Sequence, residues 1–121
     1  MVTLVSALSA ALLGDAFASH AKVINSTDNT IYVFLRGQGM KKPSHTEAVP
    51  ARATVDLTIN DEHIGSQKVF EAIASTERTG DPDLKPLAGT CSQLSKDTDY
   101  TLLIESTKMG LKTSCTAIPQ D

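Results

Sequence analysis

The stretch Ala53–Ile59 reads ATVDLTI and carries the most regular pattern in the chain. Apolar and polar side chains alternate along its whole length. Because successive side chains of a strand point to opposite faces, this pattern predicts a strand with one buried face. The polar run 60–65 that follows predicts a turn.

Short extended segments recur on both sides of this strand, bounded by residue types that favour turns. No sustained 3.6-residue period follows the N-terminal segment. The segments lie at 20–25, 30–36, 47–49, 53–59, 68–75, 100–104 and 111–118, with a short helix as the alternative for 68–75. We therefore expect an all-β fold, a small antiparallel β-sandwich of about seven strands, with an immunoglobulin-like arrangement or a small barrel as its versions.

The composition bounds the class of protein. The chain has 121 residues, a formal net charge of -3, 40% hydrophobic residues and only 4% aromatic residues. This balance permits one folded domain and argues against intrinsic disorder. Without a basic stripe, nucleic acid is not expected as a partner.

The N-terminal segment resembles an export signal in its pattern. Val2–Leu13 is apolar with small residues mixed in, and the triplet Ala16-Phe17-Ala18 matches a cleavage site. The run is too short to cross a bilayer, which needs roughly 20 apolar residues. We expect residues 1–18 to be a signal peptide and 19–121 a single domain, secreted or periplasmic, with no membrane span after removal of the signal. Asp15 and the missing basic residues leave an N-terminal apolar helix as the alternative.

The two cysteines, Cys91 and Cys115, are predicted to form a disulfide in an exported protein. Closing a loop of about 25 residues stabilises a fold by roughly 3 to 3.5 kcal/mol in the chain-entropy model. Free thiols or half of a metal site are the alternatives.

Catalytic templates are missing from the sequence. It contains no GxSxG, P-loop, GxGxxG or HExxH motif, so we expect neither an enzyme nor a cofactor. The alternative function is copper or zinc binding through His20, His45 and His63, because imidazole suits both metals. Their spacing follows no compact ligand pattern.

The expected function is recognition of another macromolecule, a protein or a surface glycan, by a monomer or weak dimer. In 30–36, Tyr32 and Phe34 lie opposite three aliphatic residues, so either this strand is covered on both faces or an aromatic pair is exposed for recognition. The predicted loops 37–46 and 76–90 are longer than strand connection requires. The candidate contacts are Tyr32, Phe34, Asp81, Asp83 and Lys85. A secreted protease inhibitor or effector-like protein is a further alternative.

Asn25-Ser26-Thr27 matches the acceptor pattern for N-glycosylation. A three-residue pattern arises often by chance, so we infer no function from it.

Overall fold

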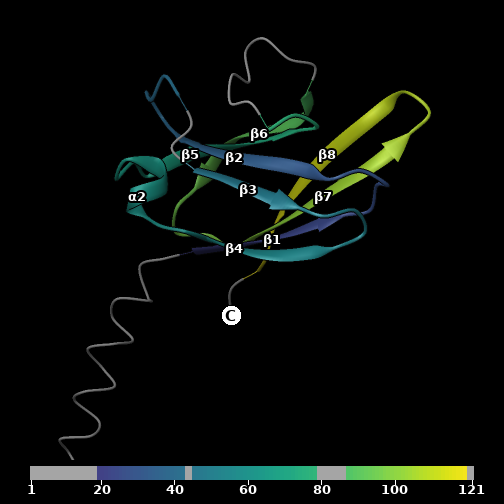
Figure 1. The fold of residues 1–121 in the computed structure, drawn as a ribbon. Coiled ribbons are helices and arrows are strands. Elements are labelled where there is room, and N and C mark those ends of the chain that lie inside the picture. The colour runs from purple at the N-terminus through teal and green to yellow at the C-terminus, as the bar shows by residue number, and fades with distance from the viewer. Residues whose placement is uncertain (1–18, 43–44, 79–86, 120–121) are drawn as a thin grey trace, which may run out of the picture.

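The structure is a computed structural model that describes residues 19–42, 45–78 and 87–119. These residues form two four-stranded sheets packed face to face (Figure 1). The first sheet has the order β4-β1-β7-β8, with β4 Thr54–Ile59, β1 Ser19–Asn25, β7 Tyr100–Thr107 and β8 Gly110–Ala117. The second has the order β3-β2-β5-β6, with β3 His45–Val49, β2 Ile31–Gly37, β5 Val69–Ser75 and β6 Leu87–Ser95. The predicted all-β sandwich is confirmed, as two separate sheets and with eight strands.

The alternating stretch that predicts the fold is β4. Leu57 and Ile59 are buried against the second sheet, while Thr58 is exposed on the other face. β4 pairs antiparallel with β1, whose other neighbour, β7, runs parallel to it. This β1–β7 pair departs from the predicted antiparallel arrangement, because a connection through the other sheet lies between the two strands.

The core lies between the inner faces of the two sheets and is mainly aliphatic. Close packing of such side chains is the dominant stabilising contribution in a domain of this size. Its largest members are Val23, Ile31, Val33, Leu35, Val49, Ile59, Ile64, Phe70, Leu102 and Ile104.

β6 is the strand that the sequence pattern does not predict. Its first four residues, 87–90, belong to the stretch predicted as a loop, so that prediction is wrong for them. The reason is local: Gly89 adopts φ +151, and two register irregularities interrupt the pairing with β5. Alternation of apolar and polar residues fails where a strand is bulged.

The predicted turn at 60–65 contains a short helix, α2, from Asp61 to Ile64. Asn60 caps its N-terminus by accepting hydrogen bonds from the backbone N–H groups of Glu62 and His63. Gly65 ends it in the left-handed conformation. The segment 68–75 is a strand, β5, and the helical alternative for it is wrong.

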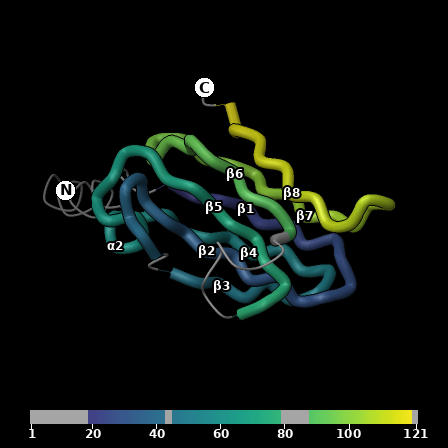
Figure 2. The backbone as a smooth tube through the Cα atoms, turned by 90° about the horizontal axis from the view of Figure 1, so that it is seen from above, coloured from purple at the N-terminus to yellow at the C-terminus, as the bar shows by residue number. Residues whose placement is uncertain are grey.

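A seam between β6 and β8 joins the two sheets along one side of the sandwich (Figure 2). The predicted disulfide Cys91–Cys115 is confirmed, with Cα atoms 6.2 Å apart. Beside it, Thr113 Oγ1 donates a hydrogen bond to the carbonyl of Ala88 at 3.1 Å. A Cβ at Gly89 would meet Thr113 Cβ at 2.7 Å, so only glycine permits this approach.

Within the described residues, no helix is both long and apolar enough to cross a membrane. The predicted signal peptide at 1–18 lies outside the described residues.

Candidate functional site

The surface carries a groove of about 600 Å³ at the end of the second sheet. It lies where β2 passes into the loop 38–42, beside β5 and β6. This volume falls in the range of ligand-binding pockets. The groove is lined by Arg36, Gly37, Gln38, Gly39, Met40, Lys41, Val69, Phe70, Glu71, Ser92 and Gln93.

One wall of the groove is a β-bulge in β6. Phe70 pairs with Leu94 and Ala72 pairs with Cys91, so Glu71 alone stands opposite both Ser92 and Gln93. Gln93 has φ +59, which is uncommon for a residue with a side chain. Bulges re-aim side chains and are enriched near functional sites, as are residues with strained backbones.

The floor of the groove carries an ion pair between neighbouring strands. Arg36 and Glu71 are directly opposite each other in the β2–β5 register. Nε and Nη2 of Arg36 each lie 2.6 Å from Oε2 of Glu71, and the two side chains are only 16% and 25% exposed. Nη1 of Arg36 also donates to the carbonyl of Lys41 at 3.3 Å, which ties the loop to the strand.

The loop that forms the other wall packs against the end of α2. A Cβ at Gly37 would meet the Ile64 carbonyl oxygen at 1.9 Å, so glycine lets the strand touch the helix backbone. The backbone N–H of Gly37 donates to Sδ of Met40 at 3.3 Å. Sδ of Met40 in turn lies 3.1 Å from where a Cβ of Gly65 would stand. The groove and α2 are therefore in direct contact.

α2 also brings two histidines together. The rings of His63 on α2 and His45 at the start of β3 are stacked, with centroids 4.0 Å apart and planes inclined by 24°. Nε2 of His45 is buried and lies 3.4 Å from Oε1 of Glu47. Burial lowers the pKa of His63 below its ordinary value of 6.5, and the neighbouring His45 lowers this pKa further. A hydrogen bond with the Thr58 backbone and the carboxylates of Glu62 and Glu47 act in the opposite direction.

The prediction that Tyr32 and Phe34 form an exposed aromatic pair is wrong for Phe34. Phe34 is only 2% exposed, and it stands opposite Ile73, which is 1% exposed, on the face of the second sheet that points away from the core. This face is therefore covered at Phe34, which agrees with the alternative that the strand is covered on both faces. Tyr32 is half-buried and stays available as a partial contact.

The other predicted contacts, Asp81, Asp83 and Lys85, lie outside the described residues. The predicted loop 37–46 is shorter than expected, because β2 extends to Gly37 and β3 begins at His45. Its remaining part includes the segment 38–41 that lines the groove.

Of the three histidines in the metal hypothesis, the structure stacks His45 on His63. His20 is not part of this stack: it is exposed on β1, and its backbone N–H donates to Oδ1 of Asp99 at 2.9 Å. Across the described ranges, no group of three or more His, Cys, Asp or Glu side chains is placed to hold a metal ion.

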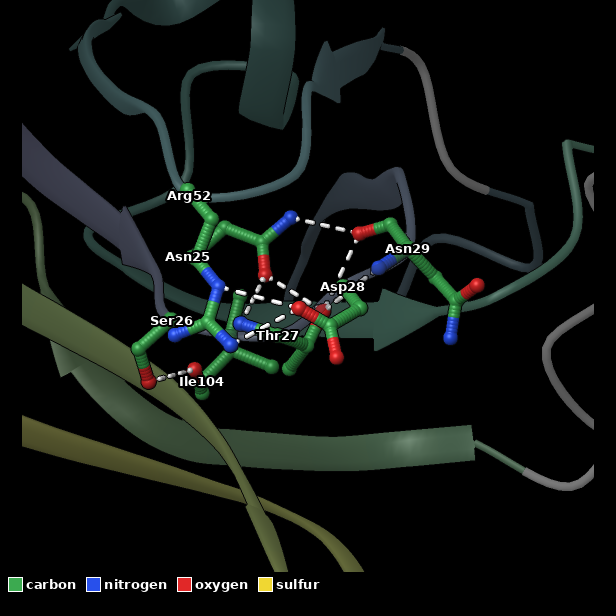
Figure 3. Close-up of polar contacts among 7 residues, drawn as sticks. All are labelled: Asn25, Ser26, Thr27, Asp28, Asn29, Arg52 and Ile104. Atoms are coloured by element: carbon green, nitrogen blue, oxygen red, sulfur yellow. Dashed lines mark hydrogen bonds and ion pairs between the residues drawn. The ribbon is translucent and has the colours of Figure 1, made fainter.

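The glycosylation pattern falls on a buried polar cluster that links the ends of several strands (Figure 3). Asn25 is 1% exposed, and its Nδ2 donates to the carbonyls of Asn29, Val49 and Pro50 at 2.8 to 3.1 Å. Its Oδ1 accepts from the backbone N–H and hydroxyl of Thr27. The amide of Asn25 is thus part of the interior of the fold.

Sequence reasoning missed the groove residues that lie on strands, among them Arg36, Glu71, Ser92 and Gln93. A signal was present for the first two, because each places a charge within a strand of otherwise apolar residues. Two such charges of opposite sign in neighbouring strands predict a cross-strand pair. Nothing in the sequence signals the bulge at Ser92 and Gln93.

No protein-family model matches the chain, and no curated protein matches its sequence.

Proposed function

We propose that the protein is an exported, non-enzymatic binding module, secreted or periplasmic, that recognises another protein through the groove. The observation that carries the proposal is that three features lie together at the groove. A cavity of about 600 Å³ meets a β-bulge with a strained Gln93 and a half-buried ion pair between Arg36 and Glu71. Recognition sites are commonly built this way, from loops and bulges held on a rigid sheet.

The side chains at the groove favour recognition over catalysis. Its lining, as far as the chain is described, contains neither histidine nor cysteine, and its carboxylate, Glu71, is neutralised by Arg36. Nucleophilic catalysis requires an activated nucleophile next to a base. Ser92 is the hydroxyl of this lining, and none of the lining side chains is a histidine that could activate it.

A protein partner fits the lining better than a glycan. Amide, hydroxyl and charged groups of Gln38, Ser92, Gln93 and Lys41 surround the cavity, which suits hydrogen bonding to a polypeptide. The aromatic ring of the described lining, Phe70, is 2% exposed and so offers no flat face to a sugar. Tyr32, on the same face of β2 as Arg36, extends the surface toward the other end of the sheet.

Site-specific photo-crosslinking of the exported protein tests this proposal. A photoreactive side chain is placed at Gln93, at Lys41 or, as a matched control, at Lys112. Lys112 is exposed on β8, in the other sheet and outside the groove. Each variant is irradiated in the periplasmic extract or culture medium of the cells from which the protein comes.

The proposal predicts one protein adduct of the same mass at positions 93 and 41 and none at 112. Unlabelled wild type should compete for it, whereas a Gln93→Arg variant, which places a longer, charged side chain at the groove wall, should not. An adduct at 112 alone would refute the groove as the contact surface. An adduct that glycosidases remove and proteases leave intact would replace the protein partner with a glycan.

A further inference from the structure

We propose that the His45–His63 stack is an acid-sensitive latch between β3 and α2, and that protonation of His63 changes the shape of the groove. As a statement about regulation of binding, this inference rests on the proposed function. As a conformational change it is measurable without any partner, so the two can fail separately.

The geometry of the stack makes a second proton unfavourable. With centroids 4.0 Å apart, two imidazolium rings would place like charges face to face in a partly buried site. The carboxylates that face the pair are Glu47 on β3 and Glu62 on α2. They favour one positive charge on the pair, whereas a second charge meets both repulsion and burial. Asp61, also on α2, is paired with Lys96 beyond β6.

The helix that carries His63 is a single turn. α2 has four residues, and a helix of one turn has little stability of its own. Ile64 is fully buried in the core and anchors one side of the turn, and the histidine stack holds its neighbouring residue. Repulsion within the stack therefore acts on the one-turn helix that also carries Ile64 and ends at Gly65.

The end of this turn forms the back of the groove wall. The Ile64 carbonyl touches the backbone of Gly37, and Gly65 touches the side chain of Met40. Gly37 and Met40 both line the groove. A displacement at His63 is thus passed on through two adjacent residues of the same turn to the groove loop.

A nuclear magnetic resonance titration of the isotopically labelled protein tests the latch, from about pH 7.5 to about pH 5.5, the range in which histidines change charge. We expect the backbone amide shifts of Gly37, Gly39 and Gly65 to follow the midpoint of the His63 ring. In His45→Phe, which keeps an aromatic ring but removes the neighbouring imidazole, the His63 midpoint should rise and the shift amplitude at the glycines should fall. His20→Phe, outside the stack, should change neither.

Glycine amides whose shifts do not follow the His63 midpoint would overturn the latch. The same would hold if the shifts were unchanged in His45→Phe. If a variant does not fold, the wild-type titration alone decides this. With a captured partner, we expect affinity to change by about fivefold or more between these pH values in wild type but not in His63→Phe. Glycine amides that titrate without any change in affinity would leave the latch in place and contradict the groove as the binding surface.

Discussion

Nδ2 of Asn25 donates a hydrogen bond to the carbonyl of Val49, 3.0 Å away, and so ties the end of β1 in one sheet to the end of β3 in the other. The same nitrogen reaches the carbonyls of Asn29 and Pro50. A single buried amide therefore joins backbone carbonyls from two connections of the chain.

Replacing Asn25 with alanine should destabilise the fold by about 3 kcal/mol, because the buried Val49 carbonyl and the buried Thr27 N–H each lose a hydrogen bond to its amide. Asn29→Ala is the matched control, since Asn29 contributes its backbone carbonyl and its exposed side chain can be removed. This control should change stability by less than about 0.5 kcal/mol. Urea unfolding of both variants measures the difference, and equal stabilities would show that the amide is not the link between the sheets.

The buried position of Asn25 also predicts the fate of its glycosylation pattern. Nδ2, the atom that would carry a glycan, already donates within the fold. Folded protein exported from a eukaryotic host should therefore carry no glycan at Asn25. Mass spectrometry of the intact protein checks this, and a folded, glycosylated product would refute the placement of this side chain.

Gly89→Ala should destabilise the seam between the sheets by more than Gly110→Ala. Both glycines have positive φ, but a Cβ at Gly89 collides with Thr113, whereas a Cβ at Gly110 meets nothing within 4 Å. We expect about 1 kcal/mol from the backbone conformation at each position, and an additional 1 to 3 kcal/mol, roughly, from overpacking at Gly89. Thermal unfolding of the two variants gives the comparison, and similar melting temperatures would argue against the close approach of β6 and β8.

Loss of the disulfide should cost about 3 kcal/mol, from the loop that Cys91 and Cys115 close across the seam. The double variant Cys91→Ser, Cys115→Ser should keep its far-ultraviolet spectrum but unfold at lower urea concentration. Retention of wild-type stability in this variant would mean that the core alone supports the sandwich.

Stability should decrease as the pH falls below about 6.5, the ordinary histidine value. The pKa of His63 is lowered in the folded state, so the unfolded chain binds the proton more readily. The stabilisation that neutral His63 contributes is complete above the pKa that this side chain has in the unfolded chain. It is lost as the pH falls toward the lower pKa of the folded state. Urea unfolding between about pH 7.5 and about 5.5 measures it. His63→Phe should flatten this part of the profile, and an identical slope in wild type and variant would contradict the burial of the ring.

The fold was largely predictable, because its signals are local. Alternation in 53–59 predicts β4, and two cysteines in a chain with the pattern of an export signal predict the disulfide. β6 escaped prediction because Gly89 and the bulge at Ser92 and Gln93 interrupt the alternation.

The candidate site was harder to predict than the fold. Alternation placed Phe34 opposite the aliphatic residues of its strand but could not say whether that face is covered, and the ring is buried. Arg36 and Glu71 are 35 residues apart and meet only through the β2–β5 register. Likewise, His45 and His63 come together only because α2 packs against the sheet, which no short motif encodes.

The most direct test of the central claim, that the groove is the recognition surface, is the affinity of the cross-linked partner for two folded variants. Gln93→Arg places a longer, charged side chain at the wall of the groove, and Lys112→Glu changes a charge on the opposite sheet. We predict a loss of about tenfold or more for Gln93→Arg and less than about twofold for Lys112→Glu. Equal affinities of the two variants, or a larger loss for Lys112→Glu, would contradict the claim.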